Sequence, residues 1–95
     1  MVHEPENNRF VLRRDGVELG FTEYDRPHGG YRFLHTEIDP AIQERGLGTI
    51  LVQGALDWLR ENSDARVSAT CPFTRAFLRR HPEYHDLTER GASAE

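Results

Sequence analysis

Three segments within the first forty residues have the hydrophobic and polar patterns of strands. Residues 17–24 alternate apolar and polar side chains, as a strand with one face in water should. Residues 10–14 and 31–38 are rich in aromatic and β-branched side chains, which also favours strands. Asp15-Gly16 joins the first two segments and is a strong signal for a tight hairpin. The pattern predicts an antiparallel meander of three strands that ends at Asp39-Pro40.

A helical period follows the meander. Apolar and small residues recur three and four positions apart and form one stripe along a helix of about four turns. The stripe consists of Leu47, Ile50, Leu51, Gly54, Ala55, Trp58 and Leu59. Residues 62–64 close this helix, and residues 65–70 read as the next strand. Two strands joined through one helix are expected to lie parallel, with a right-handed crossover.

The remaining residues predict a second helix. Cys71 stands at its N-cap and Pro72 at its first position, where proline is tolerated. Its inner and bordering face is predicted to carry Phe73, Ala76, Phe77 and Arg80, and Pro82 ends it. We therefore expect one α+β domain over residues 9–87. Residues 1–8 are expected to form a flexible leader and residues 88–95 a disordered tail.

Composition narrows the class of protein. The 95 residues are 37% hydrophobic and 29% charged with a net charge of −4, which indicates a globular protein without a basic face for nucleic acid. No apolar run approaches the length of a membrane span or resembles a secretory signal. One cysteine forms no internal disulfide, which fits a reducing cytoplasm. We expect a cytoplasmic protein that binds neither nucleic acid nor membrane, as a monomer or weak homodimer.

The segment between the third strand and the long helix is the strongest candidate for a site. It reads Gln43-Glu44-Arg45-Gly46-Leu47-Gly48-Thr49 and places two glycines where a helix begins. Backbone N–H groups at a helix N-terminus bind phosphate, and glycines let a ligand approach. The segment lacks the lysine of a Walker loop and the third glycine of a dinucleotide fingerprint. A plain tight turn remains the alternative.

The pattern Q-x-x-G-x-G resembles the acyl-CoA pyrophosphate loop of the GNAT N-acetyltransferase superfamily. Four further short matches occur in order along residues 9–87. They are His35-Thr36-Glu37-Ile38 (H-T-x-[VIL]), Ala55-Leu56-Asp57 (A-L-D), Cys71-Pro72-Phe73 (C-P-F) and His81-Pro82-Glu83-Tyr84 (H-P-E-Y). Together they look like a group of very short, stand-alone members of the superfamily. The resemblance implies a compact GNAT-like fold, with a three-strand meander followed by a β-α-β unit and a C-terminal helix.

The resemblance also implies a cofactor, acetyl-CoA, and a set of binding residues. Backbone groups at the start of the long helix would hold the pyrophosphate, and the edge of the third strand would pair with the pantetheine arm. The positions concerned are Thr36, Ile38, Gln43, Arg45, Gly46, Leu47, Gly48 and Thr49. A solvated loop side chain remains the alternative for Arg45. The implied reaction is direct acetyl transfer to an amine, either a small molecule or a peptide.

The chain departs from the superfamily in two places. It lacks the N-terminal helices that wall the acceptor site in longer members. The second helix carries Phe77-Leu78-Arg79-Arg80 where typical members have a tyrosine that protonates the leaving thiolate. These departures favour the alternative function of a non-catalytic CoA- or acyl-CoA-binding module.

Three residues are candidates for chemistry. His35 and Glu37 share one face of the third strand, where either would accept a proton from the amine. Cys71 lies at a helix N-terminus, which lowers a thiol pKa and suits a nucleophile or a proton donor. The structural alternatives stay open: a hydrogen-bonded His35, a solvated Glu37, and a Cys71 that packs as a small hydrophobe.

We predict no metal site. His81 and His85 have helical ligand spacing, but Pro82 interrupts the helix and no second cysteine or acidic cluster accompanies them. Tyr84 is expected to pack the C-terminal segment onto the sheet, with replacement of the missing acid as the alternative.

Overall fold

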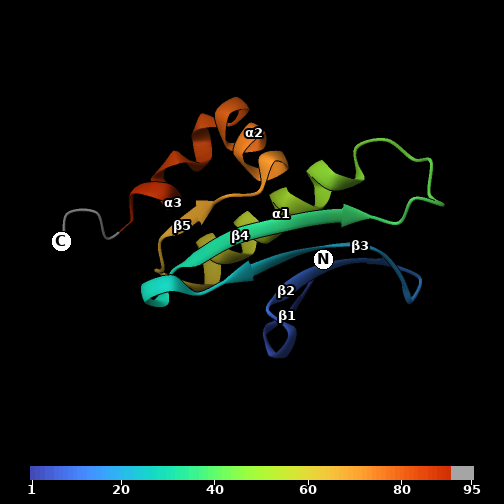
Figure 1. Ribbon diagram of the computed structural model, residues 1–95, viewed down its shortest axis with the longest axis horizontal. Helices are drawn as coiled ribbons and strands as arrows, with labels where there is room; N and C mark the ends of the chain where they lie inside the picture. Colours follow the sequence, from blue (N-terminus) through green and yellow to red (C-terminus); the bar gives the residue numbers. More distant parts are fainter. Residues whose placement is uncertain (91–95) are drawn as a thin grey trace.

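The computed structural model describes residues 1–90, which form a five-stranded sheet and three α-helices (Figure 1). The sheet order is β1-β2-β3-β4-β5. Its strands are β1 (Val2–Glu4), β2 (Arg9–Arg14), β3 (Val17–Asp25), β4 (Tyr31–Ile38) and β5 (Val67–Ala69). The helices are α1 (Leu47–Asn62), α2 (Pro72–Arg80) and α3 (His85–Glu89). Short 3₁₀ turns, η1 (Pro5–Asn7), η2 (Pro27–Gly29) and η3 (Pro82–Tyr84), lie between them.

The topology confirms the predicted α+β class and the GNAT-like order of elements. Strands β2, β3 and β4 form the antiparallel meander, and β5 lies parallel to β4 after the α1 crossover. Asp15 and Gly16 take positive φ angles of 52° and 79°, as the two central residues of a tight hairpin turn require. Helix α2 begins after the Cys71 N-cap and stops before Pro82, as the sequence predicts.

The core lies between the sheet and α1, but the buried stripe of α1 is rotated from the predicted one. Its buried residues are Leu47, Leu51, Val52, Ala55, Leu56 and Leu59. The prediction for Ile50 is wrong, because 53% of Ile50 is exposed. Val52 and Leu56 are buried instead of Ile50, because the face of α1 that lies on the sheet includes these two residues. Trp58 packs against the core and is partly buried.

A β-bulge in β4 changes which side chains face the helices. Tyr24 pairs with Phe33 and the preceding Glu23 pairs with His35, so that Leu34 is an extra residue in β4. Side chains normally alternate between the two faces of a strand, and an extra residue reverses the alternation. Phe33 and Thr36 therefore both point toward the helical face, although they are three residues apart.

The N-terminal segment corrects the prediction of a flexible leader over residues 1–8. Val2–Glu4 forms β1 and pairs antiparallel with β2. The imidazole of His3 stacks on Phe10 with ring centroids 4.4 Å apart and shares a 2.6 Å hydrogen bond with the Tyr24 hydroxyl. The His3 ring thus packs on an apolar surface and makes a hydrogen bond at its polar edge, and these two contacts stabilise β1 against the sheet.

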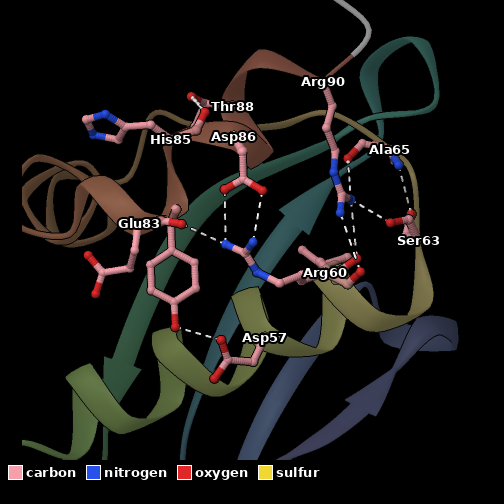
Figure 2. A network of polar contacts seen from close by, with 11 residues as sticks. Asp57, Arg60, Ser63, Ala65, Glu83, His85, Asp86, Thr88 and Arg90 are labelled. Carbon is pink, nitrogen blue, oxygen red and sulfur yellow. Dashed lines mark hydrogen bonds and ion pairs between the residues drawn. The ribbon is translucent and has the colours of Figure 1, made fainter.

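The C-terminal segment corrects the prediction of disorder at residues 88–90. Thr88 and Glu89 belong to the end of α3. Arg90 donates hydrogen bonds to the carbonyl oxygens of Leu59, in the last turn of α1, and of Ser63, its C-cap. Figure 2 shows the Arg90 guanidinium group beside Ser63. Leu59 O already accepts the N–H of Ser63, so Arg90 adds a second hydrogen bond there, and its positive charge meets the negative end of the α1 dipole. The predicted disorder of residues 91–95 lies outside the described residues.

Within residues 1–90, no helix is both long and apolar enough to cross a membrane.

Candidate functional site

The first turn of α1 presents backbone donors without acceptors. Gly46 is the N-cap and takes a left-handed conformation, with φ of 82°, which glycine adopts without strain. Its carbonyl oxygen accepts the N–H of Ile50 at 3.0 Å. Within residues 1–90, the N–H groups of Leu47, Gly48 and Thr49 have no acceptor. A Cβ on Gly46 would meet nothing within 4 Å, so the space beside the N-cap is open.

The second glycine of the segment has a packing role. A Cβ on Gly48 would stand 2.8 Å from Cζ of Phe73, on α2. Gly48 therefore allows the Phe73 ring to lie against α1, and its missing Cβ accommodates that ring. The prediction for Phe73 is wrong in one respect: 42% of this residue is exposed, while its neighbour Thr74 is fully buried.

An ion pair holds the loop that leads into α1. Both guanidinium Nη atoms of Arg14, at the β2–β3 hairpin, donate to the carboxylate of Glu44, at 2.8 Å and 2.7 Å. This pair lowers the pKa of Glu44 below its usual value, mainly through the hydrogen bond from Arg14. Gln43 and Arg45 flank Glu44, are exposed, and make no side-chain hydrogen bond or ion pair with residues 1–90. Both are therefore available to a ligand in front of the helix.

Within residues 1–90, the second half of β4 has an edge that no other strand pairs with. The N–H of Asp39 donates to Leu19 O, which fixes the register and directs the backbone groups of Glu37 toward β3. The groups of Thr36 and Ile38 consequently point to the opposite edge. Strand β5 pairs only with residues 31–33 of β4 and does not reach them. The N–H groups of Thr70 and Cys71 both donate to Phe33 O, and there the chain turns away from β4 into α2.

Cys71 lies at the point where the two strands separate. It is 3% exposed, and its thiol donates a 3.5 Å hydrogen bond to the Thr36 hydroxyl. Burial raises the pKa of this thiol, but the N–H of Thr74 and the hydroxyl of Thr36 outweigh burial, so the pKa is lowered overall. The direction agrees with the expectation for a thiol at a helix N-terminus.

His35 and Glu37 lie on the other face of the sheet. They share a face, as predicted, with His35 Nε2 3.8 Å from Glu37 Oε2. Both are exposed, and the ring of His35 lies beside Phe21. Because Thr36 alternates with them and contacts Cys71, the structure does not bring His35 and Glu37 together with the thiol. The bulge does not change this relation, since it precedes all three residues.

The tyrosine considered as a replacement acid is engaged elsewhere. The Tyr84 hydroxyl donates a 2.6 Å hydrogen bond to Asp57 (Figure 2). Burial and the neighbouring Asp57 carboxylate raise the pKa of Tyr84 to about 12. Tyr84 is buried and packs beside Phe77, so that it holds the C-terminal segment against α1 and α2 and not against the sheet as predicted.

The two histidines with ligand spacing have separate partners. His81 Nδ1 lies 3.4 Å from Glu83 Oε2, and His85 Nε2 lies 2.9 Å from Leu78 O. Among residues 1–90, no three His, Cys, Asp or Glu side chains are grouped as metal ligands would be.

The comparison with protein families covers most of the chain. The model of the GCN5-related N-acetyl-transferase family matches residues 9–87. The chain belongs to this family. A search of curated proteins found no match. Membership of the GCN5-related N-acetyl-transferase family indicates an acetyltransferase, and the family typically uses acetyl-CoA.

Sequence reasoning missed two threonines beside the thiol. The Thr22 hydroxyl lies 2.9 Å from that of Thr36 and extends the polar contact of Cys71 into the sheet. Thr74 Oγ1 is buried and has no hydrogen-bond partner among the described residues. Thr22 sits in the alternating pattern of its strand and Thr74 is three residues after an N-cap, so position alone marks neither as functional.

Proposed function

We propose that this protein is a small acetyl-CoA-dependent N-acetyltransferase that transfers an acetyl group to an amine by direct transfer. The proposal rests on two sets of backbone groups that lie at the same end of the molecule and have no hydrogen-bond partner among residues 1–90. Helix α1 begins and β4 ends at that end (Figure 1). The helix offers N–H donors for a diphosphate, and the β4 edge offers donors and acceptors for an amide-containing arm.

The residues present fit the coenzyme in chemistry as well as in position. The N–H groups of Leu47, Gly48 and Thr49 and the positive end of the α1 dipole suit a diphosphate. Gln43 and Arg45 would add side-chain donors from the loop. Thr36 and Ile38 would exchange backbone hydrogen bonds with the two amides of the pantetheine arm. Acetyl-CoA would supply the acetyl group as an activated thioester.

Cys71 is the residue best placed for chemistry on that thioester. Its thiol has a lowered pKa and lies where β4 and β5 separate. In direct transfer, the thiol would donate a proton to the departing CoA sulfur. In a two-step alternative, its thiolate would attack the acetyl carbon, the bond from that carbon to the CoA sulfur would break, CoA would leave as the thiolate, and the amine would then take the acetyl group from Cys71. His35 and Glu37 face away from Cys71, so a role for either requires the acceptor amine to approach from the open face of the sheet.

One observation favours a second candidate, a CoA-binding module without turnover. Family members with the usual mechanism have a tyrosine acid, and the Tyr84 hydroxyl is committed to Asp57. In the module, the helix N-terminus and the β4 edge would bind CoA in the same way, and Cys71 would line the pocket.

Thermal unfolding with CoA and acetyl-CoA tests the shared part of both candidates. A ligand that binds only the folded state adds about 2.7 kcal/mol of stability at a hundredfold excess over its Kd. Gly48→Val should abolish the shift, and circular dichroism checks that this variant is folded, because the new side chain meets Phe73. Gly54→Ala, six residues along the same helix, should retain the shift. The absence of a shift for the wild-type chain would contradict both candidates.

Release of free CoA thiol from acetyl-CoA, measured with a panel of amines and acetyl-acceptor peptides, separates the enzyme from the module. Cys71→Ala and Cys71→Ser then test the thiol, alongside mass spectrometry of the wild-type chain for an acetyl adduct. Unchanged transfer by both variants and no adduct would exclude a chemical role for Cys71.

A further inference from the structure

Strand β5 is the last strand of the sheet formed by residues 1–90, and none of these residues pairs with its outer edge. Tyr31 N donates to Arg66 O and Thr70 N donates to Phe33 O, so the backbone groups of alternate residues 66, 68 and 70 face β4. Val67 and Ala69 therefore direct their N–H and C=O groups away from the sheet. Within residues 1–90 no hydrogen-bond partner meets these four groups.

The same edge lines a large hollow. Val67 and Ala69 form part of the wall of a cavity of about 990 Å³, and η2, α2 and the segment at 88–90 complete it. An unpaired strand edge is normally covered, shortened or charged, because it is a template for another strand. Here the edge is short and, among residues 1–90, it opens into this hollow.

The wall of this hollow is basic, although the protein as a whole carries a net charge of −4. It contains Arg66, Arg75, Arg79 and Arg90, with Glu89 as the carboxylate in the wall. Arg90 is used at the end of α1, and Arg66 donates to Thr88 O. The guanidinium groups of Arg75 and Arg79, on α2, are exposed and have no partner among the described residues. Two guanidinium groups without partners in residues 1–90 thus lie in the wall of the hollow that the β5 edge also lines.

We propose that this hollow binds an acidic peptide segment of a partner protein, which adds to β5 as a sixth strand. Main-chain groups of the segment would pair with Val67 and Ala69, and its carboxylates would meet Arg75 and Arg79. A peptide supplies both donors and acceptors to a strand edge, whereas a nucleic-acid backbone supplies acceptors only. The site lies on β5, across the strand from the edge that faces β4 and the proposed coenzyme, and it does not depend on the proposed function.

Nuclear magnetic resonance titration of the full chain tests the proposal. The probe is a capped heptapeptide of alternating threonine and glutamate, and the control is the same peptide with glutamine in place of glutamate. The acidic peptide should shift the amide resonances of Val67 and Ala69 and slow their exchange with solvent, while Ser68, which already donates to β4, changes less. Equal binding of the two peptides, or no change at Val67 and Ala69 at millimolar peptide, would overturn the proposal.

Variants separate the two parts of the recognition. Arg75→Glu with Arg79→Glu should weaken binding about tenfold or more, since two attractive pairs become repulsive. Arg80→Glu is the matched control, because Arg80 lies on the same helix and does not line the hollow. Ala69→Pro removes one outward N–H and is compatible with an edge strand, so binding should fall several-fold.

Circular dichroism checks that each variant is folded, and the arginine pair decides the outcome if the proline variant is not. Equal weakening by Arg80→Glu would show that only general charge attracts the peptide and would overturn the site. Displacement of the peptide by an oligonucleotide that leaves Val67 and Ala69 unshifted would also overturn it.

Discussion

The thiol of Cys71 donates to the hydroxyl of Thr36 across the gap between α2 and β4. This contact joins a thiol of lowered pKa to the part of β4 whose outer edge has no partner among residues 1–90. Its existence depends on the bulge at Leu34, which turns Thr36 toward the helices.

Replacing Thr36 by valine should raise the pKa of Cys71. The Thr36 hydroxyl is one of the groups that lower this pKa against the effect of burial, and valine keeps the shape of threonine without the hydroxyl. The rate of alkylation by iodoacetamide, followed against pH, should have its midpoint at higher pH in the variant. Ser68→Ala, on the neighbouring strand, should leave the midpoint unchanged. An unshifted midpoint in Thr36→Val would show that the contact does not tune the thiol.

Alanine at Gly46 and alanine at Gly48 should have different effects. At Gly46 the φ of 82° disfavours any residue with a Cβ, and we expect a loss of about 1 to 2 kcal/mol in the free energy of unfolding. At Gly48 the new Cβ collides with the Phe73 ring. Urea denaturation measures both losses.

A second substitution tests the Gly48 explanation. Adding Phe73→Ala to Gly48→Ala should recover much of the stability lost through the collision, whereas adding it to Gly46→Ala should recover none. Strict additivity in both pairs would contradict a steric role for Gly48.

Tyr84 should make stability fall at high pH. Its pKa in the folded chain is about 12, above the ordinary tyrosine value, so its contribution is complete below about pH 10 and is lost as pH rises toward 12. Tyr84→Phe should cost about 1 kcal/mol at pH 7 and narrow the difference from wild type above pH 10. Urea unfolding at pH 8, 10 and 11.5 measures this. A constant difference across the three would argue against the shifted pKa.

His3 should have the opposite pH dependence. Burial lowers its pKa in the folded chain, so its neutral form is favoured and the stability it contributes is present above the ordinary histidine pKa. Acid should remove this contribution as pH falls below about 6.5 and protonates the ring. Amide exchange of Val2–Glu4 should therefore increase on acidification relative to the intrinsic rate. The variant His3→Phe should lose that increase.

Much of the fold follows from local patterns in the sequence. The hairpin at Asp15-Gly16, the helix that begins after Gly46 and the N-cap at Cys71 each depend on a few neighbouring residues whose conformational preferences are strong. These preferences depend only on residues close together in the sequence, so they can be recognised without the structure. The family resemblance predicted the order of the strands and helices, which the structure confirms.

The features that sequence reasoning missed depend on contacts between distant segments. Strand β1 has three residues and exists because His3 fits between Phe10 and Tyr24. Phe73 packs its ring against Gly48, which lies twenty-five positions earlier in the chain, and this contact leaves part of the residue exposed. The alternation rule correctly placed His35 with Glu37, but it gave no sign that the face they share is opposite to that of Cys71.

The bulge at Leu34 has a practical meaning for anyone who would graft this loop onto another scaffold. The stretch from Thr36 to Thr49 carries the backbone groups of interest, yet its orientation is set at Leu34, two positions before it begins. A transplant into a regular strand that counts residues from Phe33 would present Glu37 where Thr36 belongs. The smallest transferable unit must therefore include Leu34 and the partner residues Glu23 and Tyr24 that accommodate it.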